Sequence, residues 1–316
     1  LITLKLVLAA ATVLDAWRDA NSELFFAAIG GYGSVGVITE AELDLADNHR
    51  VQRLNTKMGA ADYLRHFKDK IRNNKQAVFH NADLYPPEFT RVRSVTWVET
   101  ERAPTEPWRL HESDAAYPLH RYFTWAITET PLGKWRREYV IDPLIYRKKV
   151  VHWRNYEASY DVAELEPATR EHATYVLQEY FCPAERFEEF VPKMAEILQR
   201  HRVNMVNISV RHSHSDPGTL LAWARGETFA FVLYYKQRTR DNAKNRVAVW
   251  TRELIDAAIS VGGSYYLPYQ ARDGDVVVAR GAGLHPAGHQ DLAVRLQERR
   301  RAELARPEVD RRRAVP

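Results

Sequence analysis

The sequence contains only one cysteine and no long hydrophobic segment. Cys182 stands alone among 316 residues, which excludes a disulfide within the chain and a zinc site built from several cysteines. No apolar run approaches the roughly 20 residues that a membrane-spanning helix needs. The stretch from Leu1 to Ala16 is mostly apolar, but it contains Lys5 and Asp15 and lacks the initiating Met and basic leader of a secretory signal. We therefore expect no transmembrane segment and a cytoplasmic location.

An excess of positive charge is also missing from most of the chain. The net charge is +4, but residues 271–316 hold ten Arg against seven Asp and Glu, a balance of +3 that leaves +1 for residues 1–270. Nucleic-acid binding draws most of its affinity from Lys and Arg that neutralise phosphates. A nearly neutral body therefore argues against a nucleic-acid partner.

Residues 271–316 also lack aromatic residues and Lys, although the whole chain has 35 aromatics. Arg, Ala, Gly and Pro dominate this atypical tail, and such a composition cannot bury much apolar surface. We expect the tail to be disordered or a frayed helix. The same composition arises when GC-rich coding sequence is translated in a shifted frame, so a frameshift is a hypothesis that resequencing the gene would test.

The beginning of the chain is predicted to form a small first domain, residues 1–48. Residues 1–9 and 12–17 are typical of two short strands, and residues 21–29 of a helix capped by Asn21. Residues 36–46 alternate apolar and acidic side chains, which predicts a half-buried strand.

Residues 49–270 are predicted to form a second domain in which a β-α-β-β order occurs twice. Two aromatic-rich helices, 117–128 and 132–149, lie between the copies, with a bend expected at Pro143. The first copy comprises strand 51–58, helix 60–72 and strands 76–85 and 89–99; the second comprises strand 174–181, helix 184–200 and strands 203–212 and 227–236, followed by helix 240–261 and strand 264–268. This order predicts an α+β fold in which two ferredoxin-like units form one antiparallel sheet with helices on one face.

A glycine-rich turn follows the first predicted helix, in the stretch Asn21-Ser-Glu-Leu-Phe-Phe-Ala-Ala-Ile-Gly-Gly-Tyr-Gly-Ser-Val-Gly-Val-Ile-Thr-Glu40. Gly30, Gly31, Gly33 and Gly36 permit positive φ and let backbone amides approach a ligand that a Cβ would exclude. A tight connection between helix and strand without any ligand explains the same glycines. The turn by itself leaves both interpretations open.

Together with two later segments, this stretch resembles the vanillyl-alcohol oxidase superfamily of FAD-dependent oxidoreductases with a PCMH-type flavin domain. In that family a helix of the type ELFxAxxGG runs into a glycine turn and a GVIT strand. Gln178-Glu-Tyr-Phe-Cys-Pro183 is similar to the Glu-aromatic-x-x-Pro segment that opens the cap sheet of aldonolactone and alditol oxidases. Ile208-Ser-Val-Arg211 is similar to the cap strand that carries a substrate-binding Arg in alditol oxidases. The resemblance spans about residues 1–270.

The resemblance implies a remnant of the FAD-binding domain followed by a substrate-binding cap domain. The family's pyrophosphate-binding segments would precede Leu1, so we expect the chain to lack most of the flavin domain. Nothing after Tyr269 matches the family's final helices. Ser209 stands where alditol oxidases have Glu, which puts a polyol substrate in doubt.

The implied activity is oxidation of a CH–OH group of a sugar lactone or polyol by hydride transfer to N5 of FAD, with oxygen or another carrier as electron acceptor. The substrate is thus expected to be a small molecule. The residues expected to act on or bind it are Arg211, His212, His214, Tyr235, Lys236, Glu179, Gln178 and Ser209. The residues expected at the cofactor are Gly30, Gly31, Gly33, Ser34, Gly36, Val37 and Ile38.

The residue types suit these roles. The guanidinium of Arg211 can bind adjacent hydroxyls or a lactone carbonyl in a forked manner, although an ion pair with an acidic neighbour would also explain it. His212 and His214 lie two residues apart, on one side of a continuing strand, and either could accept the hydroxyl proton. With Asp216 they would form an incomplete metal site, and we expect no metal.

Tyr235 or Lys236 could face the same pocket from the neighbouring strand. Cross-strand packing is the ordinary alternative for the tyrosine. Glu179 could bind substrate or cap a turn.

Two other functions remain open. The chain could be an inactive cap that holds no flavin. Residues 174–268 also have the order of an RNA-recognition domain, and residues 229–234 fit the later positions of its aromatic consensus, but Glu227 and Thr228 occupy the places of its basic-Gly pair.

Overall fold

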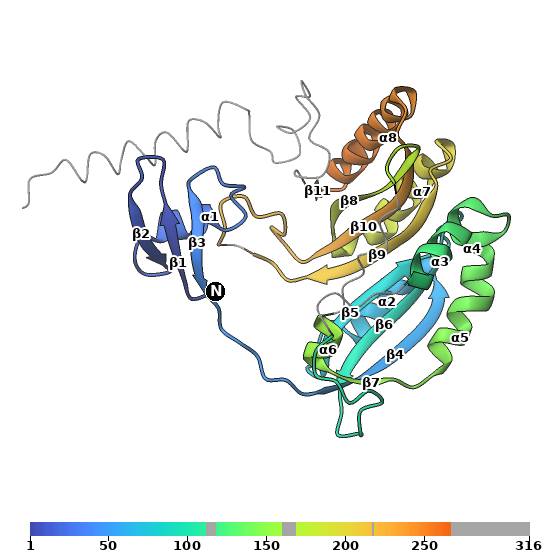
Figure 1. Ribbon diagram of the computed structural model, residues 1–316, viewed down its shortest axis with the longest axis horizontal. Helices are drawn as coiled ribbons and strands as arrows, with labels where there is room; N and C mark the ends of the chain where they lie inside the picture. Colours follow the sequence, from blue (N-terminus) through green and yellow to red (C-terminus); the bar gives the residue numbers. More distant parts are fainter. Residues whose placement is uncertain (112–117, 160–168, 217, 267–316) are drawn as a thin grey trace, which may run out of the picture. The chain divides into compact units, whose positions relative to one another are not determined.

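The computed structural model describes residues 1–111, 118–159, 169–216 and 218–266 (Figure 1). Of these, residues 1–44 and 218–222 form one compact unit, and residues 45–216 and 223–266 form the other. The sequence placed the boundary at residue 48 and assigned no later segment to the first unit. The atypical tail, 271–316, lies outside the described residues, as does the prediction made for it.

The smaller unit is a three-stranded antiparallel sheet with one short helix. Strands β1 (Thr3–Val7), β2 (Val13–Trp17) and β3 (Val37–Glu42) pair in the order β2-β1-β3, and α1 (Ser22–Ala28) precedes β3. The alternate residues of β1 and β2 face inward, and they pack against Phe25, Ala27 and Ala28 of the helix. Leu220 donates a backbone hydrogen bond of 3.2 Å to Phe26, which attaches residues 218–222 to this unit.

Two expectations for this unit are wrong. The side-chain amide of Asn21 donates to the carbonyl of Asp15 (2.7 Å) and makes no cap hydrogen bond to the helix. All six residues of β3 are exposed, so this strand is not half-buried. The reason is that β3 pairs only with β1 at the edge of the sheet and contributes no side chain to the core that α1 forms with β1 and β2.

The larger unit contains an eight-stranded antiparallel sheet in the order β11-β8-β10-β9-β5-β6-β4-β7 (Figure 1). Its elements are β4 (Arg50–Gly59), α2 (Ala60–Lys70), β5 (Ala77–Leu84), β6 (Arg91–Glu99), β7 (Val151–Trp153), β8 (Ala173–Pro183), η3 (Ala184–Arg186), α7 (Phe187–Arg200), β9 (Met205–Ser213), β10 (Thr228–Arg238), α8 (Asp241–Ser260) and β11 (Ser264–Tyr265). The predicted α+β class with a large antiparallel sheet is confirmed.

The strand order divides this sheet into two ferredoxin-like halves, β7-β4-β6-β5 and β11-β8-β10-β9. In each half the first strand lies between the third and the fourth. The halves join through β5 and β9, which pair antiparallel from Asn81 opposite Arg211 to Leu84 opposite Ile208.

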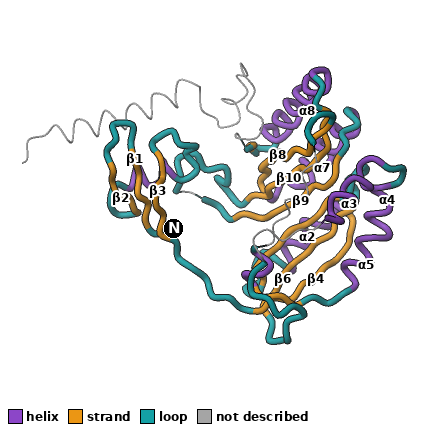
Figure 2. The backbone as a smooth tube through the Cα atoms, viewed as in Figure 1, coloured by secondary structure: helices purple, strands orange, loops and turns teal. Residues whose placement is uncertain are grey.

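One face of the sheet is covered by α2, α7 and α8, as Figure 2 shows. Apolar residues recur along α7 at helical spacing, so one side of that helix is buried against the strands. The core beneath these helices is rich in aromatic side chains: Tyr63, Phe67, Phe187, Phe190, Phe229 and Phe231 are all buried. Cys182 lies in the same core.

The opposite face carries a second group of helices, so the expectation of helices on one face only is wrong. These are α3 (Pro118–Glu129), α4 (Gly133–Arg136), the π-helical turn η1 (Arg137–Ile141) and α5 (Asp142–Arg147), with α6 (Arg154–Ala158) after β7. Arg137 ties them to the sheet by donating to the carbonyl of Val206 (2.7 Å). Pro143 lies in the first turn of α5, directly after the π-helical turn η1, so the regular helical hydrogen bonding expected through 132–149 is interrupted next to it.

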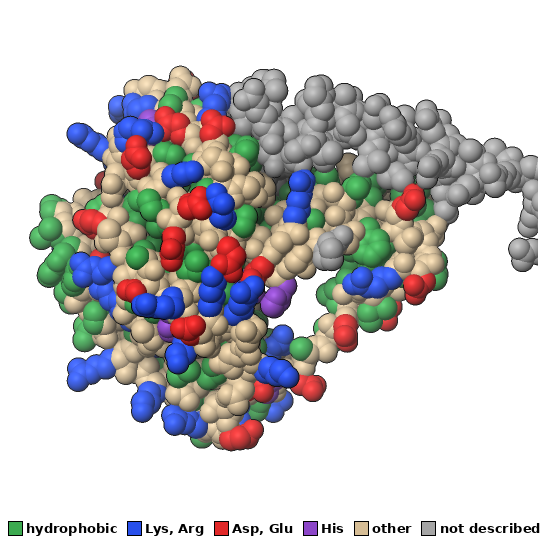
Figure 3. All heavy atoms as spheres, turned by 180° about the vertical axis from the view of Figure 1, so that it is seen from behind, with side chains coloured by type: hydrophobic (Ala, Val, Ile, Leu, Met, Phe, Trp, Pro, Cys, Tyr) green, Lys and Arg blue, Asp and Glu red, His purple; other side chains and the backbone are tan. Residues whose placement is uncertain are grey.

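The surface of the larger unit mixes both charges. Lys and Arg alternate with Asp and Glu over the view in Figure 3. None of the helices in the described ranges is long and apolar enough to cross a bilayer.

Candidate functional site

Neighbouring residues of a strand point to opposite faces of a sheet, and this divides the predicted site into two groups. Gln178, His212 and Tyr235 point to the face covered by α2, α7 and α8, among the buried aromatics. Glu179, Arg211 and Lys236 are their direct sequence neighbours and point to the other face. One pocket cannot contain both groups.

Gln178 and Tyr235 belong to a closed hydrogen-bond network in the core. The Gln178 amide donates to the hydroxyls of Tyr235 (3.1 Å) and Thr251 (3.0 Å), and its carbonyl oxygen accepts from Tyr180 (2.6 Å). Gln178 is 3% exposed and Tyr235 is 1% exposed. The expectation that these two residues contact substrate is therefore not met, because their polar atoms are used inside the protein.

His212 is a half-buried partner of Glu227. Its Nε2 lies 2.9 Å from a Glu227 carboxylate oxygen, and its ring packs against Phe67 with the ring centres 4.7 Å apart. Burial lowers the pKa of His212, and Glu227 opposes this shift. His214 follows the end of β9 with its ring centre 4.8 Å from that of His212. The two histidines do share one side, as expected, but it is not the side of Arg211.

The described residues contain no group of three or more His, Cys, Asp or Glu side chains arranged to hold a metal ion.

Lys236 lies on the same face as Arg211 but near the other end of β10. Its ammonium forms an ion pair of 2.8 Å with Glu129 and lies over the ring of Tyr175. Burial tends to raise the pKa of Glu129, but the hydrogen bonds and charges of Lys236 and Arg238 outweigh it and lower that pKa. Lys236 is thus neutralised locally and is not brought together with Arg211.

Glu179, Ser209 and Arg211 do come together, around the middle of β10. Val232 lies opposite Glu179 on one side and opposite Ser209 on the other, and Ala230 lies opposite Arg211. Neighbouring strands are about 4.8 Å apart, so Glu179 and Ser209 face each other across about 10 Å. We call these five residues the Arg211 patch.

The polar groups of the Arg211 patch are not paired. Neither the Glu179 carboxylate nor the Arg211 guanidinium makes a hydrogen bond or ion pair with any residue that the structure describes. Burial raises the pKa of Glu179, and the charge of Arg211 partly opposes this. A half-buried carboxylate and an exposed guanidinium, above the small side chains of Ala230 and Val232, leave donors and acceptors available to a polar ligand.

A network of charged residues that the sequence did not indicate borders the patch. Asp83 lies opposite Ser209 and accepts a hydrogen bond of 3.0 Å from Asn207, whose carbonyl oxygen accepts one of 3.0 Å from Arg137. Burial raises the pKa of Asp83, and the charge of Arg137 opposes this shift. The available signal was a charged residue within a predicted strand, at Asp83 and again at Arg93.

The glycine-rich turn belongs to the smaller unit, and its glycines have two different explanations. A Cβ at Gly31 would overlap the carbonyl oxygen of Ala27, and one at Gly36 would lie 2.7 Å from that of Val7, so close packing of the chain explains both. Gly30 (φ +66°) and Gly33 (φ +77°) have positive φ and open space where a Cβ would lie. They are the two positions where a ligand could approach the backbone.

Ser34, Val37 and Ile38 are exposed after this turn. Together with Gly30 and Gly33 they form the surface in this unit that fits the expected cofactor contact.

Comparisons with known proteins assign no family. No protein-family model matches the sequence, and no curated protein matches it. The functional assignment therefore rests on the described residues and on the motif resemblance.

Proposed function

We propose that this chain carries the substrate-binding sheet, and part of the flavin-binding region, of an FAD-dependent oxidoreductase that oxidises a CH–OH group of a sugar lactone or polyol. The observation that carries the proposal is the Arg211 patch. It combines an unpaired carboxylate, a hydroxyl and an unpaired guanidinium on one face of the sheet, at positions of the motifs that resemble the cap of sugar-lactone and alditol oxidases.

Each residue of the patch has a chemical role in this proposal. Arg211 donates to adjacent hydroxyls or to a lactone carbonyl oxygen, and its planar fork favours paired oxygens. Glu179 accepts a hydrogen bond from a substrate hydroxyl, and its raised pKa makes it a better proton acceptor than an ordinary carboxylate. Ser209 can donate and accept. Ala230 and Val232 are the apolar residues of the central strand between them.

The cofactor part of the proposal is supported by the glycine turn. Gly30 and Gly33 allow the backbone to approach a flat ligand, and no atom of the described residues lies within 4 Å of where a Cβ would be at either position. FAD, when bound, supplies the acceptor for the hydride.

The RNA-binding alternative is not supported by the positions of the aromatic residues. The half β11-β8-β10-β9 has the strand order that an RNA-recognition domain needs. However, Phe229 and Phe231 are fully buried against Phe187 and Phe190 on the helix-covered face. They cannot stack on bases there.

The test is an anaerobic titration of the FAD-loaded chain with sugar alcohols and sugar lactones. The readout is the loss of flavin absorbance. We expect bleaching by at least one of them, and Arg211→Ala should raise the concentration for half-bleaching at least about tenfold because it removes a charge-assisted hydrogen bond. Arg147→Ala is the matched control, since Arg147 is exposed and lies on α5. Equal bleaching by Arg211→Ala and the wild type would contradict the role of the patch.

A further inference from the structure

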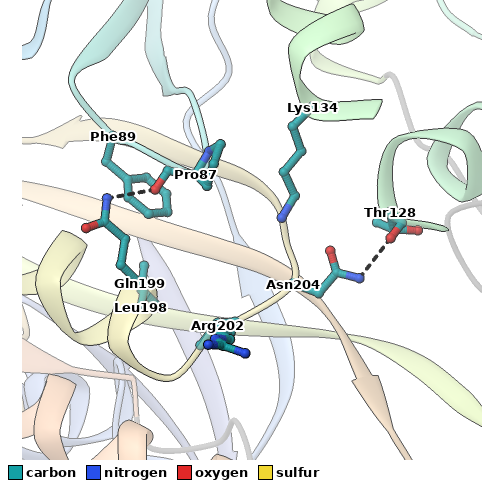
Figure 4. Close-up of a pocket in the computed structure, with 9 residues that line it drawn as sticks. Pro87, Phe89, Thr128, Lys134, Leu198, Gln199, Arg202 and Asn204 are labelled. Atoms are coloured by element: carbon teal, nitrogen blue, oxygen red, sulfur yellow. Dashed lines mark hydrogen bonds between the residues drawn. The ribbon is translucent and has the colours of Figure 1, made fainter. Parts of the chain in front are cut away.

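A separate cavity of about 510 Å³ lies in the larger unit, away from the Arg211 patch. Four segments meet around it: the connection between β5 and β6, the end of α3, the beginning of α4, and the end of α7 with the residues that lead to β9. Its lining consists of Pro87, Phe89, Thr128, Lys134, Leu198, Gln199, Arg202, Val203 and Asn204 (Figure 4). The volume lies within the range of small-molecule sites.

Two cations line this cavity without a partner. Lys134 is half-buried, and its side chain extends from α4 towards Asn204, as Figure 4 shows. Among the residues that the structure describes, no hydrogen bond or ion pair involves the Lys134 ammonium or the Arg202 guanidinium. Burial lowers the pKa of Lys134, and the charge of Glu88 opposes this without forming an ion pair. Partial burial of an ammonium without a counter-charge is costly, and a bound anion would remove that cost.

The amides of the lining are mostly engaged within the protein. Gln199 donates to the carbonyl of Pro87 (2.9 Å) and Asn204 donates to that of Thr128 (3.0 Å), and Figure 4 marks both bonds. These bonds fix the walls of the cavity. They also leave the two cations as the donors that face a ligand.

The backbone around the cavity adopts unfavourable conformations. Phe89 (φ 55°) and Arg202 (φ 51°) have positive φ, and Leu132 (φ 58°) does so two residues before Lys134. Such residues usually persist where the surrounding structure or a function requires them. Glycine is the common residue at this position after a helix. The presence of Arg202 there, despite the cost of its backbone conformation, indicates that its side chain is needed.

We propose that this cavity binds a small carboxylate with an apolar body, whose carboxylate lies between Lys134 and Arg202 and whose body contacts Pro87 and Val203. The two cations and the nearby Glu88 leave a net charge of +1, which matches a monoanion. Pro87 is exposed and Val203 is half-buried, so both have apolar surface available to a ligand. The site needs no flavin, so it stands independently of the oxidoreductase proposal.

The test is calorimetric titration of the whole chain with benzoate, with benzyl alcohol as the uncharged analogue and inorganic phosphate as an anion without an apolar body. Benzoate should bind more tightly than either. Lys134→Met should weaken benzoate binding at least about tenfold. Lys148→Met, at an exposed site directly after the end of α5, should leave the affinity unchanged.

A second variant separates binding from folding. Arg202→Gly should weaken benzoate binding while raising the melting temperature, because it removes a cation and relieves the backbone. No benzoate binding, equal binding of benzyl alcohol, tighter binding of phosphate, or full affinity in both variants would each overturn the proposal. Loss of flavin binding or of oxidoreductase activity would have no bearing on it.

Discussion

His80 lies beneath α2, where burial keeps its imidazole neutral. Its two ring nitrogens lie 2.8 Å from the hydroxyl of Tyr63 and 2.9 Å from that of Thr96. Burial lowers the pKa of His80 from 6.5 to about 4, and the charges of His66 and His212 add to the shift. The unfolded chain therefore takes up a proton before the folded protein does. Stability is lost as the pH falls below about 6.5, and this loss levels off below about pH 4.

We predict that His80 makes the free energy of unfolding fall by about 2 kcal/mol between about pH 7 and about pH 5. Urea unfolding of the wild type and of His80→Gln at both pH values measures this. The variant keeps hydrogen-bonding atoms but cannot titrate, so its stability should fall by about 2 kcal/mol less. A residual dependence from His66 and His212 is expected, because burial also lowers their pKa values. An identical fall in both proteins would contradict the assignment.

The Gln178 network yields a second prediction at this scale. Gln178→Leu would remove the acceptor of the Tyr180 hydroxyl and the donor to the hydroxyls of Tyr235 and Thr251. We expect a loss of about 2 kcal/mol in the free energy of unfolding, and unchanged substrate response at the Arg211 patch. Gln52→Leu, at a half-buried strand position, is the control. If Gln178→Leu instead abolished substrate response while remaining fully stable, Gln178 would belong to the binding site after all.

The sequence was a better guide to which residues are candidates for the site than to the contacts that these residues make. Arg211 and Glu179 were both proposed as substrate-binding residues, and the structure places them on one face of the sheet. His212 and Tyr235 were grouped with them although each is adjacent to a residue of that face, and alternation along a strand separates such neighbours. The network of Asp83, Asn207 and Arg137 could not be foreseen, because it joins three elements far apart in the chain.

At the scale of elements, Arg137 is one of several residues that hold the segment from α4 to α5 on the sheet, together with Lys57 and Tyr85. Arg137 donates to Val206 and Asn207 and lies within 4 Å of the carboxylates of Asp83 and Asp142. Both carboxylates are buried. The π-helical turn η1, which begins at Arg137, shifts the helix register at this contact.

We predict that Arg137→Met destabilises the protein by about 3 kcal/mol or more, since it leaves two buried carboxylates without their cation. Urea unfolding checks this, with the exposed Arg147→Met as the control for a change of charge on the same helical segment. The loss should shrink at low pH, where the Asp83 carboxylate, whose pKa burial raises, can bind a proton. A variant as stable as the control would show that Arg137 does not anchor this segment.

At the end of α7 we predict a substitution that increases the free energy of unfolding. Arg202 and Val203 donate to the carbonyls of Gln199 and Leu198 at 3.0 and 2.9 Å, the pattern in which a left-handed residue closes a helix. Arg202→Gly should therefore increase the free energy of unfolding by about 1 kcal/mol, because the left-handed conformation is costly for a residue with a Cβ. A less stable variant would show that the Arg202 side chain stabilises the folded protein by contacts of its own.

The sequence predicted most elements of the sheet because their apolar residues recur at clear spacings. The misses have separate causes. β3 has the alternation of a half-buried strand, but no helix of the described residues covers it. The break between α4, η1 and α5 follows from contacts with the sheet, which helical periodicity does not record. β7 is only three residues long, too short to show a pattern.

For the whole molecule, the repeated β-α-β-β order was sufficient to predict two ferredoxin-like units. It was not sufficient to predict how they join. β5 and β9 are each an edge strand of their own half, and they pair with each other. Nothing in the local sequence indicates that these two edge strands pair. This junction places the Arg211 patch beside the network of Asp83 and Arg137, because Ser209 and Arg211 lie on β9 opposite residues of β5.

The most direct measurement of the central claim is a visible absorbance spectrum of the purified chain, taken after incubation with FAD and removal of the excess. The account predicts that flavin bands remain with the protein. They should diminish in Gly33→Val, which fills the open space in front of the turn, and persist in Gly226→Val, at a glycine that also has open space around it. A folded chain that retains no flavin would contradict the claim that it is itself part of a flavin site.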